Sequence, residues 1–177
     1  MKRGWLCILT LFFMFQGTAW AGMELGQIPP SVELKDKLGG HLDGSPWSSD
    51  ELRGKVHVLF YADPDEKDLN NEASEALKEA KLPRDKYQSL AIINMAATWL
   101  PNFAISSSLK EKQKQYPTTI YLRDFKKVLV REWEIADNNN NVLAFDKKGR
   151  LIFRKDGKLE REDIETLLQA VRDHLDQ

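Results

Sequence analysis

The chain has 177 residues, of which 42% are hydrophobic and 30% are charged, and its formal net charge is -1 with neutral histidines. This length is typical of one domain, and the apolar fraction is too high for a disordered chain. A charge near zero gives no support to nucleic-acid binding. The single Cys excludes an intramolecular disulfide, a CxxC redox pair and a zinc knuckle.

Residues 1–21 predict a secretory signal peptide. A basic start precedes an apolar run over residues 5–15, and Ala19-Trp20-Ala21 forms a small-x-small cleavage pattern. The run is shorter than the roughly 20 residues of a transmembrane helix, although an uncleaved N-terminal anchor stays open as an alternative. Cys7 lies inside this segment, so cleavage would leave residues 22–177 as one domain without any Cys.

The first part of that domain predicts two strands. Residues 32–38 are expected to form the first strand, with a turn at 38–42, and residues 48–52 one short helical turn. Residues 56–62 are mostly apolar and β-branched or aromatic, which predicts a central strand buried on both faces.

A helix is expected directly after this central strand. Asp63 is suited to be its N-cap and Pro64 its first residue, and Glu66 completes a capping-box spacing. Apolar residues then recur at helical spacing until Leu82-Pro83 closes the helix.

The rest of the chain continues the alternation of strands and helices. The expected elements are a buried strand at 89–95, a basic helix at 105–116, hairpin strands at 118–122 and 128–133, a second hairpin at 142–145 and 151–154, and a last helix from about 160 to 175. Strand–helix–strand crossovers imply a parallel segment in the sheet, and the final hairpin adds antiparallel strands. We therefore expect an α/β fold with thioredoxin-like layout, a three-layer sandwich with a central mixed β-sheet and helices on both faces.

Three local patterns resemble the thioredoxin and peroxiredoxin superfamily. Residues 52–61 are similar to its "L-x-G-K-x-x-x-x-x-F" strand, and residues 142–152 are similar to its "T-F-x-x-D-x-x-G-x-I" hairpin. Tyr116-Pro117 is similar to the start of the peroxiredoxin insertion ahead of that hairpin.

A closer resemblance covers nearly all of the chain after the signal peptide. Residues 80–88, 106–109, 146–150 and 155–157 resemble the YtfJ family, small exported proteins of Gram-negative bacteria with a thioredoxin-like fold and no settled activity. This resemblance implies a periplasmic location. The chain departs from the family at Glu160-Arg161, where Thr-Pro is expected, and because Glu is a poor N-cap we expect this helix start to fray.

The resemblance also indicates the position at which this chain lacks the thiol of its redox relatives. In redox members of the superfamily the nucleophilic thiol lies at the N-terminus of the helix after the first central strand, where the helix dipole stabilises the thiolate. The equivalent residues 62–67 include no Cys, Ser or Thr, and the cis-proline that usually faces the thiol corresponds to Asn140-Asn141. Thiol–disulfide exchange and thiol peroxidase chemistry are therefore excluded for the cleaved chain acting alone. Asp63 is interpreted as an ionised helix cap, with a catalytic carboxylate as the alternative.

Other candidate residues have both a structural and a functional interpretation. The acidic cluster around Asp63 and Asp65 lacks EF-hand spacing, so we predict neither a metal nor a cofactor. Trp99 and Phe103 flank a Pro between a strand and a helix; they either pack in the core or form an exposed aromatic rim for protein recognition. The histidines, which lack metal-ligand spacing, are His41, His57 and His174.

A locally basic stretch is the last candidate. Its side chains could meet an acidic partner or anionic lipid headgroups, or they simply form a solvated helix face. The stretch comprises Lys110, Lys112, Lys114, Lys126, Lys127 and Arg131.

These observations favour an exported, Cys-free thioredoxin-like module that binds an unknown periplasmic protein or peptide without catalysis. A non-thiol enzyme that uses Asp63 and Asp65, and a structural envelope protein that uses the basic helix, are the alternatives. We expect no nucleic-acid partner and no membrane segment after cleavage. The binding residues are expected among Asp63, Asp65, Trp99, Phe103, Asn140 and Asn141.

Overall fold

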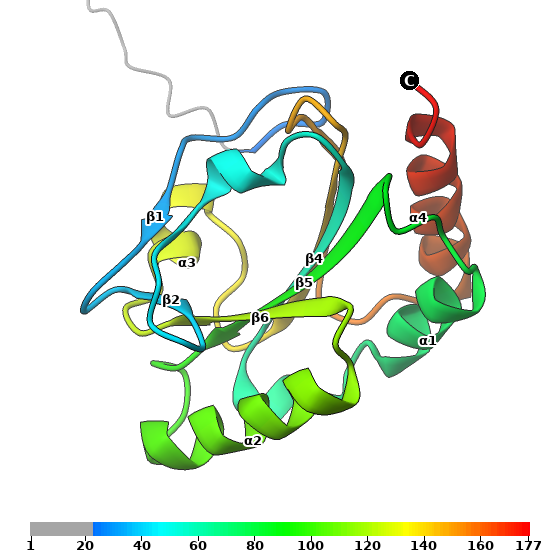
Figure 1. The fold of residues 1–177 in the computed structure, drawn as a ribbon. Helices are drawn as coiled ribbons and strands as arrows, with labels where there is room; N and C mark the ends of the chain where they lie inside the picture. Colours follow the sequence, from blue (N-terminus) through cyan, green and yellow to red (C-terminus); the bar gives the residue numbers. More distant parts are fainter. Residues whose placement is uncertain (1–22) are drawn as a thin grey trace, which may run out of the picture.

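The computed structural model describes residues 23–177, so the predicted signal peptide with Cys7 lies outside the described residues. A six-stranded mixed sheet in the order β2-β6-β5-β4-β7-β8 forms the centre, with helices on both faces (Figure 1). This architecture confirms the expected α/β sandwich. Among residues 23–177 no helix is both long and apolar enough to cross a membrane.

The strands and helices alternate along the chain. In order, they are β1 (Glu33–Leu34), β2 (Gly39–His41), β3 (Trp47–Ser48), the 3-10 helix η1 (Ser49–Leu52), β4 (Val56–Ala62), the 3-10 helix η2 (Pro64–Glu66), α1 (Asn71–Glu79), β5 (Tyr87–Asn94), α2 (Asn102–Gln115), β6 (Thr119–Asp124), α3 (Val128–Trp133), β7 (Asn140–Phe145), β8 (Leu151–Asp156) and α4 (Arg161–His174). Strands β1 and β3 pair with each other in a separate two-stranded sheet.

Strand β4 lies at the centre of the sheet. It runs parallel to β5 and antiparallel to β7, and every residue of it except Phe60 is buried, as its apolar run predicts. Its last residue, Ala62, is paired with Ile93 of β5 and with Asn140 of β7. The segments that follow β4 and β5 therefore meet the segment that precedes β7 at one edge of the sheet.

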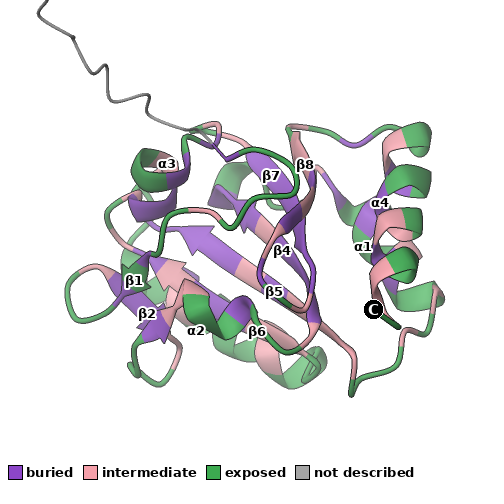
Figure 2. Cartoon of the chain, turned by 90° about the horizontal axis from the view of Figure 1, so that it is seen from above, coloured by how far each residue is buried: buried purple, intermediate pink, exposed green. Residues whose placement is uncertain are grey.

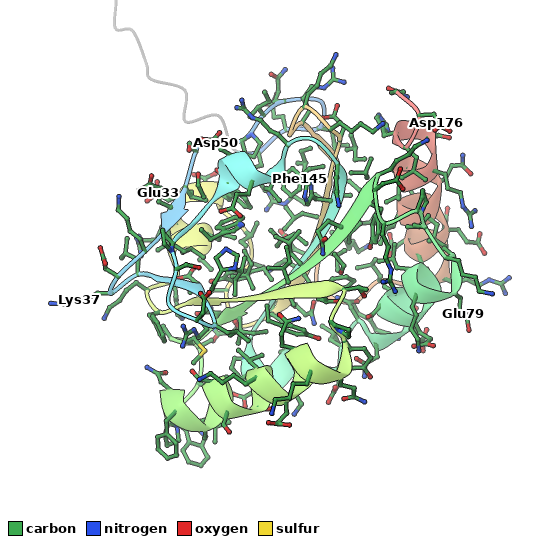
Figure 3. The ribbon with its side chains drawn as sticks, viewed as in Figure 1. Glu33, Lys37, Asp50, Glu79, Phe145 and Asp176 are labelled. Carbon is green, nitrogen blue, oxygen red and sulfur yellow. The ribbon has the colours of Figure 1, made fainter. Side chains whose placement is uncertain are left out.

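One face of the sheet carries a continuous hydrophobic core. Leu59 and Tyr61 of β4 point into it, and Trp133 of α3 covers it, with its ring centroid 5.8 Å from that of Phe145. Phe145 is fully buried, inside the layer of side chains drawn in Figure 3. The Trp133 indole N–H donates to the Pro30 carbonyl at 2.8 Å, which fastens the N-terminal segment over the same face.

The opposite face of the sheet carries two separate clusters. Helices α1 and α4 cover Val58 and Val142, whereas α2 covers Ala62 and Ile93. In Figure 2, α1 and α4 lie together with their buried inner faces toward the sheet, and α2 lies apart from them. The helices therefore leave a gap in the layer over this face.

The structure overturns the predicted hairpin after β6. Residues 128–133 form α3, because the buried Asp124 carboxylate accepts hydrogen bonds from the Lys126 N–H at 3.0 Å and the Leu129 N–H at 3.1 Å. Lys127 adopts a left-handed conformation between these two bonds, with φ 53°. The carboxylate therefore turns the chain from a strand directly into a helix.

Two predicted boundaries near the N-terminus are also wrong. The strand expected at 32–38 is confined to β1, and residues 39–41, expected in a turn, form β2 against the end of β6. The strand pairing depends on Gly39, where an added Cβ would lie 1.9 Å from the Arg123 carbonyl oxygen. A glycine pair is common in turns, but here it permits a close approach of two backbones.

The start of α4, where the sequence predicts fraying, carries a capping hydrogen bond in the structure. Glu160 is the N-cap residue, and its backbone N–H donates to the Asp163 carboxylate at 3.0 Å. Asp163 also pairs with Lys155 of β8 at 3.1 Å. Asp163 at position N3 thus makes its own half of a capping box, the bond to the backbone N–H of the N-cap residue.

Candidate functional site

Asp63 lies directly after β4, at the position predicted for the missing thiol. It is 3% exposed, and neither of its carboxylate oxygens accepts a hydrogen bond from the described part of the chain. The predicted capping interaction is therefore wrong. The Glu66 N–H, which a capping side chain would bind, donates to the Asp63 backbone carbonyl at 3.0 Å. Helix α1 begins only at Asn71, so η2 and turns replace the start of the expected long helix.

The surroundings of Asp63 favour a protonated carboxyl. Burial raises the pKa of Asp63 to about 6, and the nearby charge of Asp137 acts in the same direction. The side chain of Asn94 and the charge of Lys127 oppose this rise in pKa. A pKa of about 6 means that this carboxyl exchanges a proton close to neutral pH, which is uncommon for Asp.

Asn94 and Lys127 are both engaged by Asp137. Asn94 Nδ2 donates to Asp137 Oδ1 at 3.2 Å, and Lys127 Nζ lies 2.6 Å from Asp137 Oδ2. Asp137 is therefore paired on both oxygens, while Asp63 has no such partner within residues 23–177. An unpaired buried carboxyl beside a paired one is the unusual feature of this corner.

The predicted residues Asn140 and Asn141 meet Asp63 at this corner but are buried. The Asn140 side-chain amide donates to the Glu66 carbonyl at 3.0 Å, and the Asn141 amide donates to the Ala136 carbonyl at 2.8 Å. Both side chains therefore hold the loops of the corner in place. At the aligned cis-proline position the backbone is trans, since residues 23–177 contain no cis peptide bond.

Asn70 is a buried residue of this corner that the sequence did not single out. Its amide nitrogen donates to the Asn140 carbonyl at 3.2 Å and to the Gly157 carbonyl at 3.1 Å, and its Oδ1 accepts from the Leu159 N–H at 2.8 Å. It thereby ties the segment after β4 to β7 and to the segment that follows β8. The signal that could have suggested it, an Asn just before a helix, points instead to a cap, which Asn70 does not form.

Trp99 and Phe103 lie apart from the buried corner on the surface. They are 87% and 78% exposed, and Leu100 between them is 38% exposed. We call these three residues the aromatic surface. Of the two interpretations of the sequence, packing in the core is thus wrong, and the side chains are exposed as an aromatic rim requires. Asp65 is also exposed.

The structure offers little for a metal ion in the part of the chain that it describes. No group of three or more His, Cys, Asp or Glu side chains within residues 23–177 is arranged to hold one. His57 is buried in β4, and burial lowers the pKa of its imidazole to about 4. Its ring nitrogen Nδ1 lies 3.0 Å from the Lys55 carbonyl, which gives it a structural role.

Comparison with known proteins identifies the family of this chain. The profile of the family described as "Bacterial protein of unknown function (YtfJ_HI0045)" matches residues 29–174. The chain belongs to the YtfJ family. Its relative in Escherichia coli (strain K12), "Uncharacterized protein YtfJ", is 31% identical over 158 residues, which cover 84% of this chain and 85% of the relative.

Solved structures show the same fold for this YtfJ-family chain. A protein assigned as the thiol:disulfide interchange protein DsbE of Chlorobium tepidum matches with a TM-score of 0.63 at 15% identity, over 87% of this chain and 99% of that one. The exposed lipoprotein thioredoxin Etrx1 of Streptococcus pneumoniae matches with a TM-score of 0.55 at 20% identity, over 81% and 99%. At these identities the likeness shows a thioredoxin-like fold and not a shared activity.

Proposed function

We propose that this YtfJ-family chain is an exported, Cys-free thioredoxin-like module that binds a protein or peptide partner in the periplasm without thiol chemistry. The observation that carries the proposal is the contrast between Asp63 and the aromatic surface. The position of the nucleophile holds a carboxyl that is buried, whereas Trp99 and Phe103 are open to a partner. Exposed aromatic side chains of this kind are typical anchors of protein interfaces.

The first test addresses chemistry. The purified cleaved protein is expected to reduce no insulin disulfide and to turn over no peroxide with thiol cofactors, because both reactions need a thiolate. A thioredoxin assayed in parallel is the positive control. Activity clearly above the background without protein would contradict the proposal.

The second test addresses binding. A photoreactive residue placed at Asn102, an exposed position beside Phe103, is expected to crosslink a partner in periplasmic extracts, and Trp99→Ser together with Phe103→Ser is expected to abolish that crosslink. Ile28→Ser is the matched control, because Ile28 is also exposed (53%) but lies in the N-terminal segment. Crosslinking that survives the double substitution would argue against the aromatic surface as the binding site.

Export is tested separately. The predicted signal peptide implies that the protein in the periplasmic fraction begins at Gly22 or close to it, which intact-mass measurement resolves. Recovery of the uncleaved chain in the membrane fraction would favour the N-terminal anchor instead.

A specific observation also supports a second candidate, an enzyme with acid–base chemistry at Asp63. A carboxyl with a pKa near 6 can give and take a proton at neutral pH, and perturbed groups of this kind cluster at functional sites. The substitution Asp63→Asn distinguishes the two candidates, because it removes the titrating proton and keeps the shape of the side chain. A binding module retains its crosslinked partner and its cellular role, whereas an acid–base enzyme loses the role and keeps the partner.

A further inference from the structure

A groove of about 1250 Å³ opens between α1 and α2. Both helices lie on the same side of the sheet (Figure 1), and strand β5 runs along the floor between them. Phe60 and Ala91 form part of this floor and are only half-buried, although they belong to central strands. At one end the groove reaches Pro64 and Asn140, next to the Asp63 corner.

The groove exists because the two clusters on this sheet face do not join. Leu77 of α1 packs with Val58 and α4, and Ile105 and Leu109 of α2 pack with Ile93. No helix of residues 23–177 covers the stretch of β5 in between. A sheet face is normally buried by a complete layer of helices, so one helix position is open here.

Basic side chains dominate the lining of this groove. The lining has six basic and two acidic side chains, in a chain whose net charge is -1. Lys78 is paired with Glu75 at 2.8 Å and Lys67 with Asp68 at 3.9 Å, so the excess of positive charge comes from the other four. An occupant with negative charge is therefore complementary to the rim. The basic lining residues are Lys55, Lys67, Lys78, Lys81, Arg84 and Lys112, and the acidic ones are Asp68 and Glu75.

The shape of the groove narrows the class of occupant. Strand β5 is hydrogen-bonded to β4 and to β6, so an extended peptide has no free strand edge to join. The volume exceeds the roughly 300–1,000 Å³ of small-molecule sites. Eight residues of β5 span about 26 Å at about 3.3 Å per residue, which a helix of about 16 residues nearly matches.

We propose that the groove binds an acidic amphipathic helix of a partner protein. The apolar side of that helix would rest on Phe60 and Ala91, and its carboxylates would face the basic rim. This inference rests on the proposed role as a binding module but concerns the groove, which shares Leu100 with the aromatic surface and is lined by neither Trp99 nor Phe103. It also divides the basic stretch of α2: Lys112 lines the groove, whereas Lys110 and Lys114 do not.

The test uses a displayed library of helical peptides of about 16 residues. Leu, Ile or Phe occupies positions i, i+3, i+4 and i+7, and the remaining positions vary among Glu, Lys, Ser and Gln. Selection on the purified cleaved protein is expected to enrich Glu over Lys. The affinity of the enriched peptides, measured by fluorescence anisotropy, is expected to fall as salt rises.

Two matched pairs of variants then locate the binding. Lys112→Glu is expected to weaken an enriched peptide by about tenfold, equivalent to 1.4 kcal/mol, and Lys110→Glu much less. Ser108→Trp fills the groove from α2 and is expected to abolish binding, whereas Ser107→Trp does not, since Ser107 is exposed outside the lining. Thermal unfolding of all four variants verifies that the fold is kept.

Three outcomes would overturn the inference. They are selection without enrichment of Glu, equal effects within either matched pair, and binding of anionic phospholipid vesicles that depends on Lys112 while no peptide is selected. The aromatic surface is tested by its own crosslink. Absence of peptide binding together with a retained crosslink therefore rejects this inference alone. Absence of the crosslink together with peptide binding rejects the aromatic surface as a binding site and leaves this inference standing.

Discussion

Two buried aspartates at the same edge of the sheet have opposite surroundings. Asp124 ends β6 and is completely buried, and its carboxylate accepts hydrogen bonds from the Tyr61 hydroxyl and from two backbone N–H groups. Asp63 follows β4 and is almost as buried, yet its carboxylate accepts none from the described residues. Asp124 is explained by the fold that it stabilises. Asp63 costs stability, so its presence calls for a functional explanation.

The largest expected loss of stability comes from removing the Asp124 carboxylate, which accepts three hydrogen bonds. Asp124→Ala leaves the Lys126 and Leu129 N–H groups and the Tyr61 hydroxyl without their partner, so we expect the free energy of unfolding to fall by about 3–5 kcal/mol. Urea unfolding measures this loss. Asp65→Ala, at an exposed acid near the other site, is the control and is expected to change stability by under about 0.5 kcal/mol. A loss of less than about 1 kcal/mol for Asp124→Ala would remove the contrast.

A substitution of Asp63 is expected to raise the free energy of unfolding, and the size of this gain is expected to depend on pH. The pKa of Asp63 is raised in the folded state, so the unfolded chain loses this proton first and stability falls as pH rises from about 4 to about 6. Asp63→Asn removes that loss. We expect it to raise the free energy of unfolding by about 1–3 kcal/mol near pH 8 and by little near pH 4.

Unfolding curves of the wild type and of Asp63→Asn across this pH range give the measurement. Asp68→Asn, at an exposed acid in the turn that follows η2, is the matched control. A difference in stability between Asp63→Asn and wild type that stays constant with pH would show that the pKa of Asp63 is the same in the folded and unfolded chain, and the contrast with Asp124 would then rest on hydrogen bonding alone.

A smaller loss of stability is expected from removing one of the three donors to the Asp124 carboxylate. Tyr61→Phe removes one hydrogen bond, of 3.1 Å, and leaves the two backbone donors in place. We expect a loss of about 1 kcal/mol in the free energy of unfolding, measured by urea titration. Combined with Asp124→Ala in a double-mutant cycle, Tyr61→Phe should add much less than it does alone, because its partner is already gone. Full additivity would mean that the two side chains act independently.

The smallest effect on stability is expected at the aromatic surface. Trp99→Ser and Phe103→Ser change side chains that are mostly in water, so the free energy of unfolding should shift by less than about 0.5 kcal/mol each. Thermal unfolding measures this. A loss of about 2 kcal/mol or more would show that these residues stabilise the fold, and their exposure would no longer indicate a partner.

Much of the central sheet could be predicted from the sequence, because β4 and the second half of β5 are mostly apolar and α4 has a clear helical period. Helix α3 could not. Its residues Val128, Leu129 and Val130 favour a strand locally, and the helix depends on the Asp124 carboxylate at the end of the preceding strand. Local preference gave way there to a buried hydrogen bond.

The same limit applies to the candidate site. The position of Asp63 followed from a resemblance, but the pKa of its carboxyl depends on burial and on Asn94, Asp137 and Lys127, which lie far from it in the sequence. The exposure of Trp99 could not be derived either, since Trp residues are more often found in cores. The groove between α1 and α2 arises from how two helices are spaced on a sheet, and no single segment encodes that spacing.

The contact at Gly39 has a consequence for solubility. Strand β2 covers only the end of β6, from Leu122 to Asp124, and it can do so because Gly39 lets the two backbones approach. Any other side chain there would push β2 away and leave the N–H and C=O groups of a sheet edge open to a second molecule. Exposed strand edges pair with one another and lead to aggregation. A single hydrogen atom in place of a side chain thus lets β2 shield this end of β6 from pairing with a second molecule.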